Sequence, residues 1–287
     1  MFDLLISDPF TFMVCVFALS LCIGSFLNVV AYRLPIMMRR QAEDDYLDFL
    51  EKEPKERTTF NLSKPHSACP KCKSSIKPWQ NIPVISYVWL KGKCANCKTN
   101  ISARYPIVEL TTGLLGLLVA FQFGATWQTA ALLVFTYFLV ALTLIDLDEY
   151  LLPDSLTLPL IWIGLIANSF ALFTTLESAV YGAIAGYLSL WSIYWLFKLI
   201  TGKEGMGYGD FKLLAAIGAL LGWQSLPVVI LLSSVVGAAV GIIGIIILGR
   251  DKNIPIPFGP FLAAAGFIAA LWGNEITAAY FQFSGIR

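Results

Sequence analysis

Two aspartates at the ends of long hydrophobic segments are the residues of this chain best suited to chemistry. Asp146 lies in the string Leu-Ile-Asp-Leu-Asp, and Asp210 ends the string Gly-Tyr-Gly-Asp. A carboxylate beside lipid hydrocarbon is costly, so a chain that keeps one there usually uses it. Two carboxylates held close together share one proton, which is the arrangement of an aspartic protease. We interpret Asp146 and Asp210 as a candidate catalytic pair; the alternative is that each is an ordinary interfacial acid at a helix end.

Three glycines precede the second aspartate, namely Gly205, Gly207 and Gly209. Glycine permits positive φ angles and close backbone approach. Non-helical backbone at membrane depth is tolerated where it lines a wet cavity or is buried in protein. We expect an unwound segment that brings Asp210 into the site and leaves backbone groups able to pair with an extended substrate. A Gly-x-Gly-Asp string alone is also compatible with a flexible loop.

Other acids follow Asp146 closely. Pro153 predicts the start of a helix, with Asp154 or Ser155 as its cap. We therefore interpret Asp154 as structural, and the role of Asp148 stays open.

Four cysteines form two Cys-x-x-Cys pairs with 21 residues between them: Cys69, Cys72, Cys94 and Cys97. Two such pairs are typical of a tetrahedral zinc site, as in zinc ribbons. Because four thiolates leave no open position on the metal, we expect the zinc to be structural. The alternatives are disulfides or redox pairs. His66, three residues before the first pair, is interpreted as a solvated loop residue, and Cys15 and Cys22 as apolar packing residues.

The composition is that of an integral membrane protein. Of the 287 residues 57% are hydrophobic and 14% charged, and the mean hydropathy is +0.71. The net charge of +1 provides no basic field for nucleic acid. The single histidine disfavours hydrolases that need a Ser–His or Cys–His pair.

The hydrophobic segments predict an all-α polytopic protein with about eight transmembrane helices. The double segments 110–145 and 213–249 are each expected to turn once, at 122–128 and at 222–227. The first segment is not a cleavable signal peptide, because acids precede it and arginines follow it. The remaining single spans are expected at 9–32, 155–176, 178–197 and 253–274.

Charge asymmetry predicts the orientation. Of the 20 Lys and Arg residues, 14 lie between Arg33 and Arg104, after the first span. The N-terminus is therefore expected outside, and every connection from an odd to an even span inside the cell. Asp146 and Asp210 then lie at the same cytoplasmic edge of the bilayer. The cysteine loop is cytoplasmic too, where a reducing environment disfavours disulfides.

This topology divides the chain into three parts. Residues 1–32 form the first transmembrane helix, and residues 33–104 form a cytoplasmic loop with a zinc-ribbon-like site. Residues 105–287 form a seven-helix membrane domain that carries the aspartate pair. Within the loop, the highly charged residues 43–57 are expected to form a solvated helix or loop.

The order of these motifs resembles that of the type IV prepilin peptidases, bacterial inner-membrane enzymes distantly similar to presenilin-like proteases. The resemblance covers nearly the whole chain. It rests on both cysteine pairs and on five strings: Gly24-Ser-Phe-Leu-Asn-Val-Val, Tyr32-Arg-Leu-Pro35, Ile145-Asp-Leu-Asp148, Leu152-Pro-Asp154 and Gly205-Met-Gly-Tyr-Gly-Asp-Phe-Lys-Leu213.

The resemblance implies a bifunctional, multi-pass enzyme whose active site faces the cytoplasm. It would cut the basic leader from type IV prepilins and type II secretion pseudopilins after a glycine. It would then methylate the new N-terminal amine with S-adenosylmethionine. The family's catalytic aspartates correspond to Asp146 and Asp210, and its zinc ligands to the four cysteines.

For methylation the resemblance points to the amino-terminal third, around residues 24–35 and the zinc loop. Arg33 and Glu43 are possible contacts there, although Arg33 is equally an anchor at the membrane edge. No glycine-rich nucleotide loop of a soluble methyltransferase is visible.

Two other classes of function stay open. One is a proton-coupled transporter that uses Asp146 and Asp210 as relay carboxylates, with the zinc loop as a regulatory lid. The other is a membrane-tethered zinc ribbon that acts as a scaffold. A transporter is expected to place polar residues near the bilayer centre and to have broken helices in both halves. Here the acids lie at one edge, and a scaffold needs no such acids.

Overall fold

The computed structural model describes residues 8–53, 57–247, 249 and 255–284. Within those ranges the protein is helical, with two isolated antiparallel bridges and no sheet, which confirms the predicted all-α class. The chain forms two compact units, Met1–Ala125 and Thr126–Arg287.

The first unit pairs two long helices, α2 (Pro9–Phe49) and α4 (Arg104–Phe123). The connection between them carries the 3-10 helix η1 (Pro78–Asn81) and the short helix α3 (Ile85–Trp89). The Asp8 carboxylate starts α2 by accepting the backbone N–H groups of Phe10 and Thr11.

Helix α2 is longer than the predicted first span, because it continues through Pro35 to Phe49. Part of the charged segment 43–57 is therefore helical. Small residues bring α2 and α4 together: a Cβ on Gly24 would lie 2.9 Å from Glu109 Cα, and one on Gly113 would lie 2.8 Å from Leu21 Cδ2. Close backbone approach at small residues is the usual packing of membrane helices.

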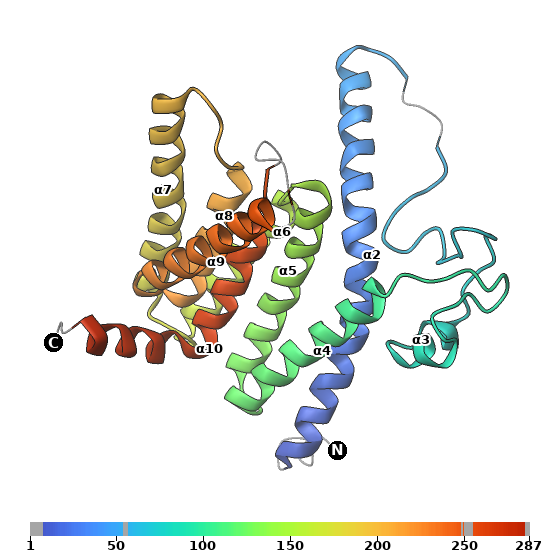
Figure 1. Ribbon diagram of the computed structural model, residues 1–287, viewed down its shortest axis with the longest axis horizontal. Helices are drawn as coiled ribbons and strands as arrows, with labels where there is room; N and C mark the ends of the chain where they lie inside the picture. The colour runs from blue at the N-terminus through green and yellow to red at the C-terminus, as the bar shows by residue number, and fades with distance from the viewer. Residues whose placement is uncertain (1–7, 54–56, 248, 250–254, 285–287) are drawn as a thin grey trace. The chain divides into compact units, whose positions relative to one another are not determined.

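In the described part of the second unit there are six helices and a short 3-10 turn. They are α5 (Trp127–Glu149), α6 (Asp154–Ser169), α7 (Leu176–Thr201), α8 (Tyr208–Leu221), η2 (Trp223–Ser225), α9 (Leu226–Ile246) and α10 (Gly259–Ser284). Helix α8 contacts α6, α7, α9 and α10, and α7 runs beside it (Figure 1). Its residues from Leu213 to Leu220 are all buried, as expected for a helix that is apolar all round.

Backbone contact between α7 and α8 depends on glycine. A Cβ on Gly182 would lie 2.2 Å from the Gly218 carbonyl oxygen, and one on Gly186 would lie 2.7 Å from that of Leu214. Any side chain at these positions would push the helices apart. The central position of α8, which carries Asp210, is thus set by small residues on its neighbour.

Each of the eight predicted spans corresponds to a helix, but not every helix has the length of a span. Among the described residues, six helices are long and apolar enough to cross a membrane. The other two, α6 and α8, have 16 and 14 residues. The structure thus identifies a multi-pass membrane protein, while the count of eight spans stays a prediction.

The predicted span 155–176 was too long at its C-terminal end, since α6 ends at Ser169. The cause is Asn168, whose side-chain oxygen accepts the N–H groups of Phe173 and Thr174 and turns the chain. The expected start of the last span at residue 253 lies outside the described residues.

Candidate functional site

Asp146 and Asp210 are both buried in the second unit, with 5% and 6% of their surface exposed. Asp146 lies in the last turn of α5, and Asp210 lies in the first turn of α8. The two carboxyl groups are near enough to interact electrostatically. The structure therefore brings together the two acids that the sequence singles out.

The Asp146 carboxylate has a backbone partner on a third helix. Its Oδ2 accepts the N–H of Gly259, the first residue of α10, at 3.0 Å. The N-terminus of a helix carries partial positive charge, which suits a carboxylate. A Cβ on Gly259 would lie 2.7 Å from the same oxygen, so only glycine leaves room for this contact. Sequence reasoning missed Gly259; its one signal is a glycine before a proline at the start of a hydrophobic segment.

The Asp210 carboxyl group has different surroundings. Its Oδ1 is buried without a hydrogen-bond partner among the described residues. A Cβ on Gly207 would lie 3.8 Å from Oδ2, so the glycine-rich backbone passes directly beside the carboxyl group. An unsatisfied buried oxygen is costly, and here it is an atom that a reacting water or a substrate carbonyl group could meet.

Leu152 connects the two acidic positions. A Cβ on Gly209 would lie 2.6 Å from Leu152 Cβ, and one on Gly259 would lie 3.1 Å from Leu152 Cδ2. This buried leucine therefore contacts the backbone beside Asp210 and the backbone that binds Asp146. Glycine at both positions allows the three segments to meet.

The segment between α7 and α8, residues 202–207, is non-helical, as its glycines predict. It is also anchored at both ends. Lys198 Nζ lies 2.8 Å from Glu204 Oε1, and the Tyr208 ring packs on that of Tyr194 with centroids 5.3 Å apart. A Cβ on Gly205 would lie 2.9 Å from the Phe197 ring. The segment is therefore held against α7.

The other acids near the pair lie apart from it. Asp148 is exposed. Asp154 Oδ1 accepts a hydrogen bond from Lys212 Nζ at 2.6 Å, which joins α6 to α8. The prediction that Asp154 or Ser155 caps α6 was wrong: Pro153 occupies the cap position and makes no side-chain bond, while Asp154 turns toward Lys212.

The four cysteines of the first unit form one cluster. The sulfur atoms of Cys69, Cys72, Cys94 and Cys97 all lie within 4.8 Å of one another, and those of Cys69 and Cys97 are 3.8 Å apart. Zinc–sulfur bonds of about 2.3 Å in a tetrahedron place sulfur atoms about 3.8 Å apart. The donor set fits a metal ion.

Both cysteine pairs fold into the same turn. The Lys73 N–H donates to Cys69 O, and the Lys98 N–H donates to Cys94 O, at 2.9 and 3.1 Å. Both lysines have positive φ, and each turn is closed by an isolated bridge, Ala68 with Ser75 and Lys93 with Asn100. Two equivalent turns thus present four sulfur atoms to one centre.

Backbone N–H groups favour the thiolate form of Cys72 and Cys94, whereas burial and the neighbouring sulfur atoms raise the pKa of Cys97 to about 11. The Ser74 N–H lowers the pKa of Cys72 to about 6, and the Cys97 N–H lowers the pKa of Cys94. Thiolate is the form that binds metals. His66 is exposed and is not part of the cluster.

The packing role expected for Cys15 and Cys22 was wrong, because both are exposed. Helix α2 instead buries the face that carries Ser20, Gly24 and Leu27.

Arg33 and Glu43 both have partners within the first unit. The buried Arg33 guanidinium donates to the carbonyl oxygens of Asn61 and Pro65 at 2.9 and 2.6 Å. Glu43 Oε2 lies 2.7 Å from Arg57 Nη2. Arg33 therefore closes a turn of the loop 33–104 in addition to any other role.

Sequence reasoning missed one more buried acid, Glu109 of α4. It is 8% exposed, and its Oε2 accepts the N–H of Val84 at 2.8 Å. Val84 has a φ of 61°, which is strained for a β-branched residue. Glu109 holds this part of the loop against the helix pair. Its only signal in the sequence is a charge directly before a hydrophobic segment.

Comparison with known proteins identifies the family. Residues 18–123 match the model of the bacterial peptidase A24 N-terminal domain, and residues 133–242 match that of the type IV leader peptidase family. These ranges fall on the two compact units of the fold.

Curated relatives cover almost the whole chain. A protein of Pseudomonas aeruginosa is 57% identical over 287 residues, 99% of each chain. A protein of Aeromonas salmonicida is 54% identical over 95% of this chain and 94% of its own, and one of Neisseria gonorrhoeae is 51% identical over 93% of each. All three are named prepilin leader peptidase/N-methyltransferase. No solved structure matches. The chain belongs to the type IV leader peptidase family.

Proposed function

We propose that this protein is a membrane aspartic endopeptidase that removes the leader of type IV prepilins and type II secretion pseudopilins. It then methylates the new N-terminal amine with S-adenosylmethionine. One observation is the main support for the peptidase assignment. Two buried aspartates, Asp146 and Asp210, lie on separate helices at one site, beside a glycine-rich segment. The names of the relatives support the same assignment over a proton-coupled transporter.

The proposed reaction needs one ionised and one protonated carboxyl group. The ionised group takes a proton from water while the water oxygen attacks the scissile carbonyl carbon, and the protonated group donates a hydrogen bond to the carbonyl oxygen. The C–N bond then breaks, and the leaving amine takes up a proton. Because two close carboxyl groups titrate as a pair, neither residue is assigned a fixed role. Gly259 would orient Asp146 throughout.

We place the active site at the cytoplasmic face of the bacterial inner membrane, with the N-terminus outside and eight spans. The charge distribution around the first span supports this orientation. The apolar stem of the prepilin would lie among the spans and the surrounding lipid, and its leader would reach the carboxyl pair from the cytoplasm.

The four cysteines would hold a structural zinc ion in the cytoplasmic loop 33–104. The zinc ion would hold the two turns together. It would have no catalytic role, because four thiolates complete its coordination. We assign methylation to the first unit and proteolysis to the second. Their separate matches to two family models support this division.

The test is cleavage of a purified prepilin in detergent. The protein should convert the prepilin to the shorter form, while Asp146→Asn and Asp210→Asn should each abolish conversion, because an amide cannot accept the proton of water. Asp154→Asn serves as the matched control: it removes the negative charge that pairs with Lys212 and should lower stability but leave cleavage by folded protein. Near-normal cleavage by either of the first two variants would remove that residue from the pair.

A further inference from the structure

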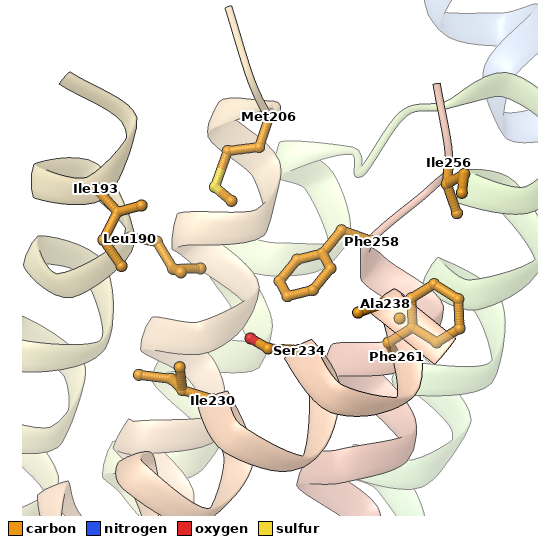
Figure 2. Close-up of a pocket in the computed structure, with 10 residues that line it drawn as sticks. Leu190, Ile193, Met206, Ile230, Ser234, Ala238, Ile256, Phe258 and Phe261 are labelled. Atoms are coloured by element: carbon orange, nitrogen blue, oxygen red, sulfur yellow. The ribbon is translucent and has the colours of Figure 1, made fainter. Parts of the chain in front are cut away.

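The second unit contains a groove whose role the carboxyl pair alone does not explain. It has a volume of about 300 Å³ and lies among α7, α9, the start of α10 and the segment before α8. Figure 2 shows Met206 and Phe258 extending into the space between Leu190 of α7 and Ser234 of α9. Of its ten lining residues, only Ser234 has a polar side chain. The groove is therefore suited to apolar groups.

Two of the lining residues connect the groove to the acids. Met206 directly precedes Gly207, where a Cβ would lie 3.8 Å from Asp210 Oδ2. Phe258 directly precedes Gly259, whose N–H binds Asp146 Oδ2. One wall of the groove therefore continues into the backbone beside each carboxyl group. The groove and the two carboxyl groups therefore have backbone segments in common.

We propose that the groove binds the apolar side chains that directly follow the scissile bond of the substrate. This inference rests on the proposed peptidase function. A volume of about 300 Å³ lies at the lower end of ligand sites. It accepts one or two side chains, not a whole helix. The substrate segment would therefore be extended where it crosses the carboxyl pair and would place its first apolar side chains between Met206 and Phe258.

Selection by this groove would depend on shape. Lipid is as apolar as the groove, so burial alone gives the substrate little advantage, and close packing supplies the preference. Filling the groove should therefore remove a preference for bulky side chains without removing the catalytic groups.

Two neighbouring alanines of α9 provide a matched pair of variants. Both are exposed, but Ala238 lines the groove and Ala239 does not. Ala238→Phe fills the groove, and Ala239→Phe adds the same bulk to the outer face of the same helix. Both would be compared with the unchanged protein, in detergent, on two prepilins. The prepilins share one leader and one cut site, and the apolar residues directly after the cut are either Leu or Ala.

The unchanged protein and Ala239→Phe should cleave the Leu substrate with a kcat/KM about tenfold above that of the Ala substrate, a modest packing effect. Ala238→Phe should bring this ratio close to one, mainly by raising KM for the Leu substrate. Retained cleavage of the Ala substrate shows that the variant is folded. If it does not fold, Ile230→Ala is used instead, because it enlarges the groove. This variant should raise the kcat/KM of a third prepilin, with Phe after the cut, relative to that of the Leu substrate.

An unchanged ratio in Ala238→Phe, or an equal fall in both variants, would overturn the proposal. The proposal is also overturned if added phospholipid stabilises the unchanged protein but not Ala238→Phe, while the Leu-to-Ala ratio stays the same in both. The groove would then bind a lipid chain and not the substrate. Failure of the unchanged protein to cleave either prepilin would instead contradict the proposed function.

Discussion

At the scale of single residues, the two aspartates of the site differ in their polar contacts. Asp146 accepts a backbone N–H from Gly259, while Asp210 has one buried oxygen without a partner among the described residues. A carboxylate held by a fixed donor keeps its orientation during a reaction. An oxygen without such a donor is open to substrate or water. The pair is therefore asymmetric before any substrate binds.

This asymmetry makes Gly259 a positioning residue that can be tested. In Gly259→Ala the added methyl group would start 2.7 Å from Asp146 Oδ2, so the carboxylate or the start of α10 must move. Since a displacement of about 1 Å can cost about 100-fold in rate, we expect kcat for leader removal to fall at least tenfold with little change in KM. Gly273→Ala in the same helix is the control, because its Cβ would have no neighbour closer than 3.8 Å. Equal kcat values in the two variants would contradict the role.

The cysteine cluster gives a second prediction at this scale. Purified protein should contain about one zinc ion per chain, bound by four thiolates. Cys69→Ser and Cys97→Ser should each release the ion and expose the loop 33–104 to protease, as measured by metal analysis and limited proteolysis. Cys22→Ser on α2 should keep the metal, because Cys22 is exposed and is outside the cluster. Zinc-free protein with an intact loop would be evidence against a structural metal.

At the scale of the helix, α8 is positioned by contacts that only small or polar residues can make. Gly182 and Gly186 allow α7 to touch its backbone, and Asn168 of α6 binds its C-terminal end. The last carbonyl groups of a helix have no partner within it. Asn168 supplies one by donating from Nδ2 to the carbonyl oxygens of Ala219 and Leu220, at 2.9 and 2.7 Å. The same side chain also ends α6, so it sets two elements at once.

Replacing this asparagine should destabilise the second unit. Asn168→Ala removes the side-chain donor to two carbonyl groups at the buried C-terminal end of α8 and the acceptor of two N–H groups after α6. Each unsatisfied buried group costs about 1–3 kcal/mol, so we expect a clear fall in melting temperature in detergent. Ser169→Ala is the control: this exposed hydroxyl donates only to Ile166 of its own helix. If the two variants melted at the same temperature, the bridge between α6 and α8 would contribute no stability.

At the scale of the whole molecule, the cysteine cluster and the carboxyl pair lie in different compact units. The first unit holds the cysteine cluster and the buried Glu109, and the second holds the carboxyl pair and the groove. Methyl transfer needs a neutral amine aligned with a sulfonium group, and it needs no pair of acids that share a proton. The two activities should therefore be separable.

Separation is tested with a pilin that has already lost its leader. Asp210→Asn should still transfer methyl groups from labelled S-adenosylmethionine to this pilin, although it cannot cut the precursor. Conversely, changes around residues 24–35 should leave pilins cut but poorly methylated. Loss of methylation by folded Asp210→Asn protein on the cleaved pilin would indicate one merged site.

The sequence alone identified the main chemical groups because their signals are local. Hydropathy and charge predicted that Asp146, at the end of one span, and Asp210, at the start of another, lie at the same membrane face. The spacing of the cysteines predicted a metal site. The glycines before Asp210 likewise predicted the non-helical segment that the structure contains. Each of these inferences uses neighbours within a few residues or the summed charge of a loop.

Only the tertiary structure revealed what surrounds these groups. The bond from Gly259 to Asp146 joins positions 113 residues apart, and nothing in the sequence near either residue indicates it. The contact of Leu152 with two glycines, the early end of α6 at Ser169, and the groove beside Met206 and Phe258 likewise depend on how separate helices pack. The hydropathy of a residue predicts whether it is shielded from water. It does not predict which helix the residue contacts, because any apolar partner shields it. Side-chain volume and backbone hydrogen bonding decide that choice, and both act only once the helices are in contact.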